Sequence, residues 1–390
     1  MTDTPLRIGF IPLVDAAALI IAVDKGFTAA EGLNVRLVRE VSWSNVRDKL
    51  NIGLFDAAHL LAPVAIASTL GLSQVKVPVL APFNLCLNGN AITVSPALHA
   101  AIVGEADGDP IDPMVTAKAL ARVVAARRKV GDEPLIFGMT FPFSTHNYQL
   151  RFWMAAGGVD PDEDVRLVVL PPPYMVDSLA NGHVDAFCVG APWNSVAVDL
   201  GVGHILHFVS DILERAAEKV LAMRETWALE NPALVAGLAR AHGQAAEFIA
   251  NPDNRAEVSR ILSAPERIGV DPEVIRRTID GRLKISPDGA CRESGRYLLI
   301  GRDGAARPDP VQAAWLYAQM VRWGQAAYTP QALEVARNVF RPDLYDAAIG
   351  SFAEPAQGVP DGIGAFDGSP FDPDNIAAHL ASFAIKRRPA

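Results

Sequence analysis

The sequence predicts an α/β fold of two similar lobes, in which parallel-rich sheets are flanked by helices and a helical C-terminal part packs on the first lobe. Three observations lead to this prediction. The first 71 residues repeat as residues 135–201 at an offset close to 130. Short apolar runs alternate with helical patterns through both copies, which is typical of βαβ units. The chain has 390 residues, which is too long for one ordinary hydrophobic core.

The repeat depends on several matches that share one register. The matching pairs are Val-Arg-Leu-Val at 35–38 and 165–168, Asp-Ala at 56–57 and 185–186, and Ala-Pro at 62–63 and 191–192. The alternative is two unrelated α/β segments that share common turn residues. Two similar lobes explain the common register better, and two lobes enclose a cleft. The expected division is lobe one at 1–92, lobe two at 93–200, and a return to lobe one with a helical extension at 201–390.

The first copy reads as strands that are each followed by a helix. Val46 and Leu50 lie one helical turn apart and predict the buried face of one of these helices. Gly26 and Gly71 mark two helix ends. The expected elements are strand Leu6–Pro12, helix Asp15–Lys25, strand Val35–Val41, helix Ser44–Asn51, strand Ala57–Leu61, helix Val64–Leu70 and a strand that starts with Val75–Leu80 and leads through Pro82 to Cys86–Asn90.

The second copy repeats this order, and the pattern becomes mainly helical from residue 205 onward. The second copy is expected to contain strand Leu135–Gly138, helix Ser144–Ala156, strand Val165–Leu170, helix Tyr174–Asn181, strand Val184–Val189 and a helix after Pro192. The later helices are expected at Asn231–Ala250, Asn254–Leu262, Pro272–Ile279, Pro310–Gly324 and Pro330–Val339. The stretch Phe352–Asn375 is rich in Pro, Gly and Asp, so an irregular surface wrap is expected there.

Composition excludes several classes of function. The net charge is −9 and the pI is near 5.4, which argues against a nucleic-acid-binding surface because such a surface needs a basic stripe. An anion would therefore have to be bound by local donors against an unfavourable overall field. The longest apolar runs, Ala16–Val23 and Leu60–Ala67, are too short to span a membrane. Three cysteines without a C-x-x-C pair predict reduced thiols.

Polar residues lie where three of the expected helices begin. Asp15 starts the first helix of lobe one, Ser42-Trp43-Ser44 the second, and Ser144-Thr145-His146 the first helix of lobe two. Ligands of open α/β sheets bind beyond the carboxyl ends of the strands, where helix N-termini offer free N–H donors. The alternative is ordinary capping by Asp, Ser and Thr. Capping does not account for Trp43 or His146.

Several short motifs along the chain share one family pattern. They are Gly9-Phe10-Ile11-Pro12-Leu13, Ser42–Lys49, Pro82-Phe83-Asn84-Leu85, Leu87–Thr93, Pro142–Tyr148, Cys188–Asn194, Glu218-Lys219-Val220-Leu221, Ala313-Ala314-Trp315, Arg322-Trp323-Gly324, Phe366-Asp367-Gly368 and Phe371-Asp372-Pro373. With these motifs the sequence resembles the nitrate/bicarbonate-binding protein family. The resemblance covers almost the whole chain and implies a type II periplasmic-binding-protein fold, in which two lobes close on a small oxyanion.

The resemblance also implies a ligand site between the lobes. By position, Trp43 walls the pocket, Asn90 donates from its side-chain amide, and His146 donates from its imidazole. Gly190 offers its backbone, and Lys219 supplies the positive charge. A planar monoanion needs several N–H donors and one cation to offset its desolvation, so this set is chemically suitable. The alternative for Lys219 is a solvated surface lysine.

Lys219 favours nitrate or nitrite over bicarbonate, because bicarbonate carries a proton and needs an acceptor. Bicarbonate-binding relatives place an acidic residue, together with a calcium ion, around this position. Two departures leave the relative affinity for nitrate and nitrite open. Ala191 stands where the family commonly has Glu, and Asn90 stands where relatives have Asn or Gln. No cofactor and no metal site are expected.

The N-terminus predicts a cytoplasmic protein. Met1–Pro5 runs directly into the first strand, without the basic, apolar and cleavage regions of a signal peptide. The chain then resembles NasS-type nitrate/nitrite sensors, which hold an RNA-binding ANTAR-domain antiterminator inactive until the anion binds. The expected partners are a small inorganic anion and such an antiterminator, with no direct contact to nucleic acid or to a membrane.

Two other classes remain open. One is the exported substrate-binding protein of a nitrate transporter, whose signal has been removed from this sequence. The other is an enzyme on the same fold, with His146 as acid/base and Asp15 or Asp56 assisting. The sequence offers no nucleophile–base pair, no metal-spaced His cluster among its 8 His and no Gly-rich phosphate loop, so no catalytic residue is assigned.

Overall fold

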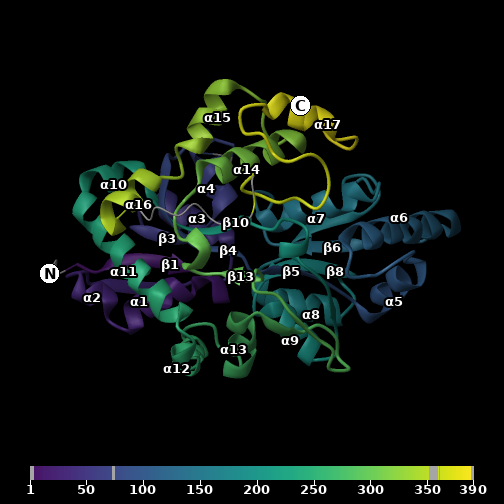
Figure 1. The fold of residues 1–390 in the computed structure, drawn as a ribbon, viewed down its shortest axis with the longest axis horizontal. Coiled ribbons are helices and arrows are strands. Elements are labelled where there is room, and N and C mark those ends of the chain that lie inside the picture. The colour runs from purple at the N-terminus through teal and green to yellow at the C-terminus, as the bar shows by residue number, and fades with distance from the viewer. Residues whose placement is uncertain (1–3, 73–74, 351–358, 360, 388–390) are drawn as a thin grey trace.

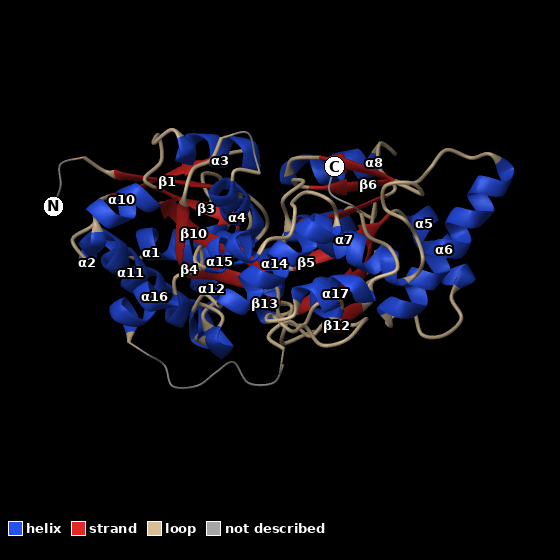
Figure 2. Cartoon of the chain, turned by 90° about the horizontal axis from the view of Figure 1, so that it is seen from above, coloured by secondary structure: helices blue, strands red, loops and turns tan. Residues whose placement is uncertain are grey.

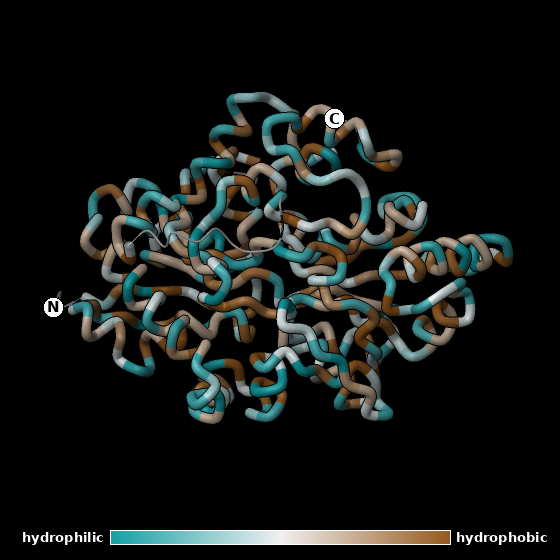
Figure 3. The backbone as a smooth tube through the Cα atoms, in the orientation of Figure 1, coloured by the Kyte–Doolittle hydropathy of each residue, from teal (hydrophilic) through white to brown (hydrophobic). Residues whose placement is uncertain are grey.

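The structure is a computed structural model that describes residues 4–72, 75–350, 359 and 361–387. It contains two lobes, each built on one mixed sheet flanked by helices (Figures 1 and 2). The strand order is β13-β4-β10-β3-β1-β2 in the first sheet and β7-β6-β8-β5-β9 in the second. Figure 3 shows hydrophobic stretches along the central strands and mostly hydrophilic outer loops. The predicted two-lobed α/β fold is confirmed.

The strands of the first sheet are β1 (Leu6–Phe10), β2 (Val35–Arg39), β3 (Ala57–Leu61), β4 (Val79–Asn88), β10 (Ala217–Arg224) and β13 (Leu298–Leu299). Those of the second sheet are β5 (Asn90–Val94), β6 (Ile136–Met139), β7 (Arg166–Val169), β8 (Ala186–Gly190) and β9 (His204–Phe208). A separate hairpin pairs β11 (Arg282–Lys284) with β12 (Cys291–Glu293).

The helices follow the chain in the same two-lobed order. The early and late helices are α1 (Ala17–Asp24), α2 (Phe27–Ala30), α3 (Trp43–Asn51), α4 (Ala62–Leu70), α10 (Glu225–Glu230), α11 (Pro232–Ala250), α12 (Arg255–Leu262), α13 (Pro272–Asp280), α14 (Pro310–Arg322), α15 (Pro330–Arg337), α16 (Pro342–Ile349) and α17 (Ile376–Ser382). The second lobe carries α5 (Pro96–Glu105), α6 (Pro113–Val130), α7 (Thr145–Ala156), α8 (Met175–Ala180) and α9 (Trp193–Asp199). Short 3₁₀ turns are η1 (Val14–Ala16), η2 (Pro172–Tyr174), η3 (Val209–Asp211), η4 (Pro252–Asn254) and η5 (Arg302–Gly304).

The internal repeat corresponds to two copies of one strand arrangement. In lobe one β1 pairs in parallel with β2 and β3, and in lobe two β6 pairs in parallel with β7 and β8. The repeated aspartates make the same contact in each copy. Asp56 Oδ2 accepts from the Arg7 backbone N–H and Asp185 Oδ2 from that of Ile136, both at 2.8 Å. The repeated Asp therefore fixes the first strand of each lobe to the third.

Each sheet is completed by a strand that arrives from the other lobe. The chain crosses at Gly89, between β4 and β5, and crosses back between β9 and β10. Gly89 has φ +93, and a Cβ there would lie 2.7 Å from Leu298 Cδ1, so only glycine suits this crossing. The crossings therefore fall at Gly89 and after Phe208, rather than after residues 92 and 200 as expected.

Three parts of the element pattern differ from expectation. β4 begins at Val79 rather than Val75, and it continues through Pro82 to Asn88 as expected. β9 and β10 lie in the stretch that was expected to be mainly helical. α5 and α6 fill the segment between the two copies, for which no element was predicted. The first part of the expected wrap at 352–375 lies outside the described residues.

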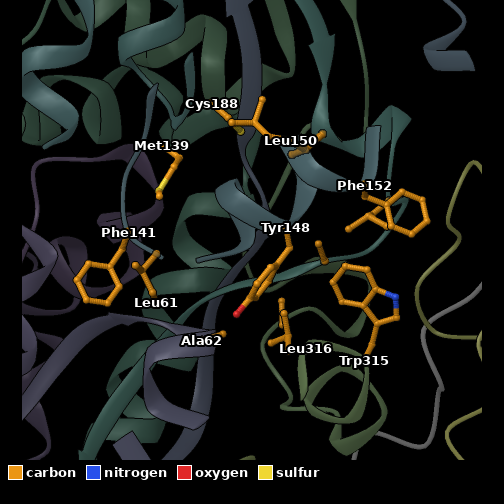
Figure 4. Close-up of a cluster of buried hydrophobic side chains, with 14 of the residues drawn as sticks. Leu61, Ala62, Met139, Phe141, Tyr148, Leu150, Phe152, Cys188, Trp315 and Leu316 are labelled. Atoms are coloured by element: carbon orange, nitrogen blue, oxygen red, sulfur yellow. The ribbon is translucent and has the colours of Figure 1, made fainter. Parts of the chain in front are cut away.

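The C-terminal part contacts both lobes. α14 and α15 pack on α4 of lobe one. The Trp315 ring of α14 also lies 6.4 Å from the Phe152 ring of α7, and Phe366 and Phe383 approach the same ring at 5.9 Å and 5.8 Å. Figure 4 shows this buried cluster, in which Tyr148 of α7 lies between Ala62 and Leu316. One continuous apolar core therefore joins the lobes. Among the described residues, no helix is both long and apolar enough to cross a membrane.

Candidate functional site

A fully buried polar cluster lies where the two sheets meet. Its centre is the start of β10, where Glu218 and Lys219 have no exposed surface. Neighbouring strand residues normally point to opposite faces. The pairing of β10 with β4 shifts register on both sides of Lys219, as in a β-bulge, and Glu218 and Lys219 contact each other at 2.8 Å. This irregularity brings both side chains into one site.

Lys219 is bound by two carboxylates. Its Nζ lies 3.0 Å from Asp15 Oδ2 and 2.8 Å from Glu218 Oε1. Burial by itself would lower the pKa of Lys219, but the two carboxylates outweigh burial and raise it, so the ammonium is retained. The positive charge expected for the ligand is thus already shared between two acids.

Asp15 and His59 form the other side of this charged group. Burial by itself raises the pKa of Asp15, but Lys219 and His59 together lower it to about 2. His59 Nδ1 accepts from the Ile11 backbone N–H at 3.4 Å, so the ring proton lies on Nε2, which is 2.9 Å from Asp15 Oδ1. Burial lowers the pKa of His59, so the ring is neutral. Asp15 therefore binds side chains rather than capping α1.

Helix α7 carries side chains of lobe two that belong to the buried cluster. Ser144 caps it by accepting from the Asn147 backbone N–H at 3.1 Å, which confirms the capping interpretation of that hydroxyl. Ser42 caps α3 through the Asn45 N–H in the same way. His146 and Gln149 follow at i, i+3 and share one face of α7. Both are fully buried.

His146 contacts the acidic part of the cluster. Its Nδ1 lies 3.0 Å from Thr140 Oγ1 and 3.4 Å from Glu218 Oε1. Burial lowers the pKa of His146 well below its ordinary value, and Lys219 lowers it further. Burial raises the pKa of Glu218, although Lys219 and a hydrogen bond from Thr145 oppose that rise. Glu218 thus joins the charged group of lobe one to the imidazole of lobe two.

Asn90 and Gly190 lie opposite each other on β5 and β8. Asn90 Nδ2 donates to Gln149 Oε1 at 3.1 Å. A Cβ at Gly190 would lie 3.1 Å from Asp15 Oδ2 and 3.4 Å from Asn90 Oδ1. Glycine therefore allows the carboxylate of lobe one and the amide of lobe two to approach the same backbone position.

Trp43 closes the cluster from lobe one. It is the first residue of α3 and is only 1% exposed. Its ring lies 5.2 Å from the His59 ring in an edge arrangement, and Lys219 Nζ lies 5.4 Å from its centroid. An aromatic face near an ammonium stabilises that charge. The position agrees with a wall of the site.

Several buried polar atoms of this cluster have no hydrogen-bond partner. They include the nitrogens Trp43 Nε1, His146 Nε2 and Gln149 Nε2 and the oxygens Asn90 Oδ1 and Glu218 Oε2. A buried polar group without a partner costs about 1–3 kcal/mol, so such groups in one place indicate a ligand. Of the three nitrogens, two come from lobe two and one from lobe one. The arrangement can bind a small acceptor-rich species between the lobes.

The five residues predicted from the sequence come together in this cluster. Trp43, Asn90, His146, Gly190 and Lys219 are connected through the contacts given above, and Lys219 is not a solvated surface lysine. The structure adds His59, Gln149 and Glu218, which the sequence did not single out as contacts. Gln149 could have been found from its i+3 spacing after His146. Glu218 could not, because a regular strand would turn it away from Lys219.

The described residues include a hydroxyl–imidazole contact, Thr140 Oγ1 to His146 Nδ1 at 3.0 Å, but no metal cluster. Among residues 4–72, 75–350 and 361–387, no group of three His, Cys, Asp or Glu side chains is placed to hold a metal ion. Cys86 and Cys188 lie near the cluster, and burial raises the pKa of each thiol well above its ordinary value, so both stay neutral.

Sequence comparisons identify relatives along almost the whole chain. Residues 1–263 match the NMT1-like family. The nitrate/nitrite binding protein NrtA of Synechococcus elongatus is 31% identical over 98% of this chain and 86% of its own length. The nitrate import ATP-binding protein NrtC of Synechocystis is 33% identical over 98% of this chain, which spans 55% of NrtC. A bicarbonate transport ATP-binding protein, CmpC of Synechocystis, is 31% identical and is likewise covered over 55% of its length.

Structural comparison agrees with these relatives. The periplasmic nitrate-binding protein NrtA from Synechocystis superposes with a TM-score of 0.87 at 29% identity, covering 98% of this chain and 99% of that protein. The aliphatic sulphonate binding protein SsuA of Escherichia coli shares the fold alone, with a TM-score of 0.56 at 14% identity over 88% of this chain and 99% of SsuA. NrtA is named as a binding protein, in agreement with the expectation of a non-enzymatic chain. The chain belongs to the NMT1-like family and, within it, to the nitrate- and bicarbonate-binding proteins that include NrtA.

Proposed function

We propose that the buried cluster binds nitrate or nitrite between the lobes. The observation that carries the proposal is the set of buried nitrogens without a partner, Trp43 Nε1, His146 Nε2 and Gln149 Nε2, which come from both lobes. Nitrate is planar and accepts hydrogen bonds on all sides without donating any, so it can satisfy donors from both lobes at once. The names of the NrtA relatives support the same ligand class.

Bicarbonate is the second candidate ligand. Glu218 offers a carboxylate oxygen within the cluster, and a bicarbonate hydroxyl needs such an acceptor. A relative of this chain is a bicarbonate transport protein. We favour nitrate and nitrite because Lys219, rather than an acid, holds the position that faces Trp43. No cofactor or metal is part of the proposal.

The lobes are held together by contacts beyond the cluster. Tyr148 Oη of lobe two donates to Gln325 Oε1 at 2.7 Å, and Gln325 Nε2 donates to the Pro142 carbonyl at 3.0 Å. Arg47 of α3 lies 5.3 Å from the Phe141 ring centroid. This arrangement is a closed clamp. An anion that contacts both lobes only when they are closed shifts the population toward closure by its differential affinity.

We further propose that this closure serves a cytoplasmic sensor, whose output is the release of an ANTAR-domain antiterminator that controls nitrate assimilation genes. The resemblance to NasS-type sensors supports this role, and a ligand site shared by two lobes supplies the coupling it needs. The partner binds the open form, so by reciprocity the anion weakens partner binding by the same factor. Transport as an exported binding protein is the competing role.

Calorimetry tests the ligand. Sodium nitrate and sodium nitrite are expected to bind without added metal, while sodium chloride gives no heat of binding. Sodium bicarbonate is tested with and without calcium chloride. Bicarbonate binding that is tighter than nitrate binding and needs calcium would overturn the assignment.

Co-purification tests the output. A complex with the ANTAR antiterminator is expected to dissociate when nitrate or nitrite is added and to persist in chloride at the same ionic strength. The expected coupling is about 1–3 kcal/mol. A Gln325→Ala variant loosens the closed clamp and is expected to need more nitrate for release. If the complex does not dissociate in nitrate although the free protein binds nitrate, the sensor role is refuted while the proposed binding site stands.

A further inference from the structure

With Glu218 ionised, the charges of the cluster disfavour the binding of an anion. Asp15 is ionised and Lys219 is protonated, so these two charges cancel. Glu218 is then the excess charge, and it lies fully buried, 2.8 Å from Lys219 Nζ. An anion at Trp43, His146 and Gln149 would enter a site that already holds one uncompensated negative charge. Two close negative charges without water between them repel strongly.

The hydrogen bonds of His146 lead to the same difficulty. Glu218 Oε1 lies 3.4 Å from His146 Nδ1, so an ionised Glu218 favours the tautomer whose hydrogen is on Nδ1. The neutral ring then presents a lone pair at Nε2, the unpartnered atom that would face the ligand. A lone pair there repels an oxyanion, whereas an N–H would bind it.

One added proton removes both obstacles. If it resides on Glu218, the carboxyl is neutral, and His146 Nδ1 can accept from the Thr140 hydroxyl, 3.0 Å away. His146 Nε2 then carries the hydrogen and becomes a donor. If the proton resides on His146 instead, both ring nitrogens donate, one to Glu218 and one to the ligand. The pair titrates as a unit in either case.

We propose that binding of the anion at this cluster is coupled to the uptake of one proton by the Glu218–His146 pair. The inference rests on the proposed function. Burial raises the pKa of Glu218, which agrees with a carboxyl that protonates readily when a further negative charge arrives. Glu218 is thereby a specificity-determining residue, because once protonated it no longer offers the carboxylate acceptor that a bicarbonate hydroxyl would need.

The other titratable groups near Glu218 do not take this role. Lys219 and Asp15 are paired with each other, and His59 keeps its proton on Nε2 toward Asp15. The thiols of Cys86 and Cys188 are neutral, since burial raises the pKa of each. Glu218 and His146 are the groups left whose protonation can change between the free and the bound protein.

The test is a calorimetric titration with sodium nitrate, which stays a monoanion throughout, in phosphate and in Tris at pH 6, 7, 8 and 9. The buffers differ in ionisation enthalpy, so the difference in observed heat counts the protons taken up. We expect uptake that approaches one proton per nitrate on the alkaline side. The affinity is expected to fall about tenfold per pH unit there.

The Glu218→Gln variant replaces the protonated carboxyl by a neutral group of the same shape. It is expected to bind nitrate with an affinity that does not depend on pH, with no proton uptake, and more tightly than the parent at pH 9. Glu214→Gln is the matched control, because Glu214 pairs with Arg296 at the surface and lies outside the cluster. It is expected to retain the proton uptake of the parent. Thermal unfolding of both variants checks that each is folded.

Three results would overturn the inference. They are buffer-independent heats in the parent, a constant affinity from pH 6 to 9, and parent-like proton uptake in folded Glu218→Gln. If the parent gives no binding heat with nitrate in any buffer, the proposed function itself fails. Nitrate binding without proton uptake refutes the coupling alone.

Discussion

The two lobes share a backbone plan but differ in the chemistry they bring to the site. β3 of lobe one and β8 of lobe two are equivalent strands, and each pairs antiparallel with a strand that crosses from the other lobe. Lys219 pairs with Leu61, and Asn90 pairs with Gly190, so Lys219 and Asn90 occupy equivalent places. Lobe one supplies a lysine and two acids there, whereas lobe two supplies amides and an imidazole.

This difference has a physical advantage for a clamp. Lys219 of lobe one is already paired with the carboxylates of Asp15 and Glu218, so its charge is compensated without the ligand. Two neutral nitrogens of lobe two, His146 Nε2 and Gln149 Nε2, have no hydrogen-bond partner. The lobe with unsatisfied donors gains most from the anion, and the lobe with paired charges holds its geometry ready.

The largest contrast is expected between Lys219→Met and Asn90→Leu. The first leaves the buried carboxylates of Asp15 and Glu218 without their cation and should lower the free energy of unfolding by about 3–5 kcal/mol. The second removes one neutral hydrogen bond to Gln149 and should cost about 1–3 kcal/mol. Urea denaturation at pH 7 measures both. Equal losses, or a smaller loss for Lys219→Met, would contradict the charge difference between the lobes.

A pH series sharpens the same contrast. The pKa of Asp15 is lowered to about 2 from an ordinary 3.8, so its contribution to stability is complete above pH 4 and is lost as the pH falls toward 2. Asp15→Asn should therefore cost about 2 kcal/mol at pH 6 and less at pH 3. Gln149→Leu in lobe two should cost the same at both pH values. A constant cost for Asp15→Asn across the series would show that its ionised form is not favoured by folding.

A smaller and symmetric effect is expected where the lobes are alike. Asp56 and Asp185 each accept a strand N–H in their own lobe, at the same distance. Asp56→Asn and Asp185→Asn should each lower the free energy of unfolding by about 1–2 kcal/mol, with little difference between them. Denaturant midpoints of the two variants measure this. Clearly different losses in the two variants would mean that the repeated contact contributes unequally to the stability of the two lobes.

Much of the fold could be predicted because the repeat fixes the order of its strands. β3 was predicted at Ala57–Leu61 and has those bounds, since an apolar strand follows Asp56 and Pro63 starts the next helix. β10 was not predicted, because a strand that completes the sheet of the first lobe from far along the chain has no local signal. Its pairing with β3 and β4 comes from tertiary structure alone.

The candidate site was also predictable only in part. The resemblance supplied five residues that the structure brings together. The partners of Lys219, however, could be identified only from the tertiary structure. Asp15 lies more than two hundred residues away along the chain, and no spacing rule connects the two. Glu218 meets Lys219 only because the strand is irregular at that point. Backbone irregularity and long-range pairing were therefore the parts that residue patterns could not supply.

One titration tests most directly whether the anion is held between the lobes. Sodium nitrate is titrated calorimetrically into the parent, into His146→Ala, and into His204→Ala, which removes a partly exposed histidine outside the cluster. Loss of a donor to a charged ligand costs about 1.5–3 kcal/mol, so His146→Ala should weaken binding roughly 10- to 150-fold while His204→Ala binds like the parent. Parent-like nitrate binding by folded His146→Ala would contradict the account, because the ligand would then not engage lobe two at this cluster.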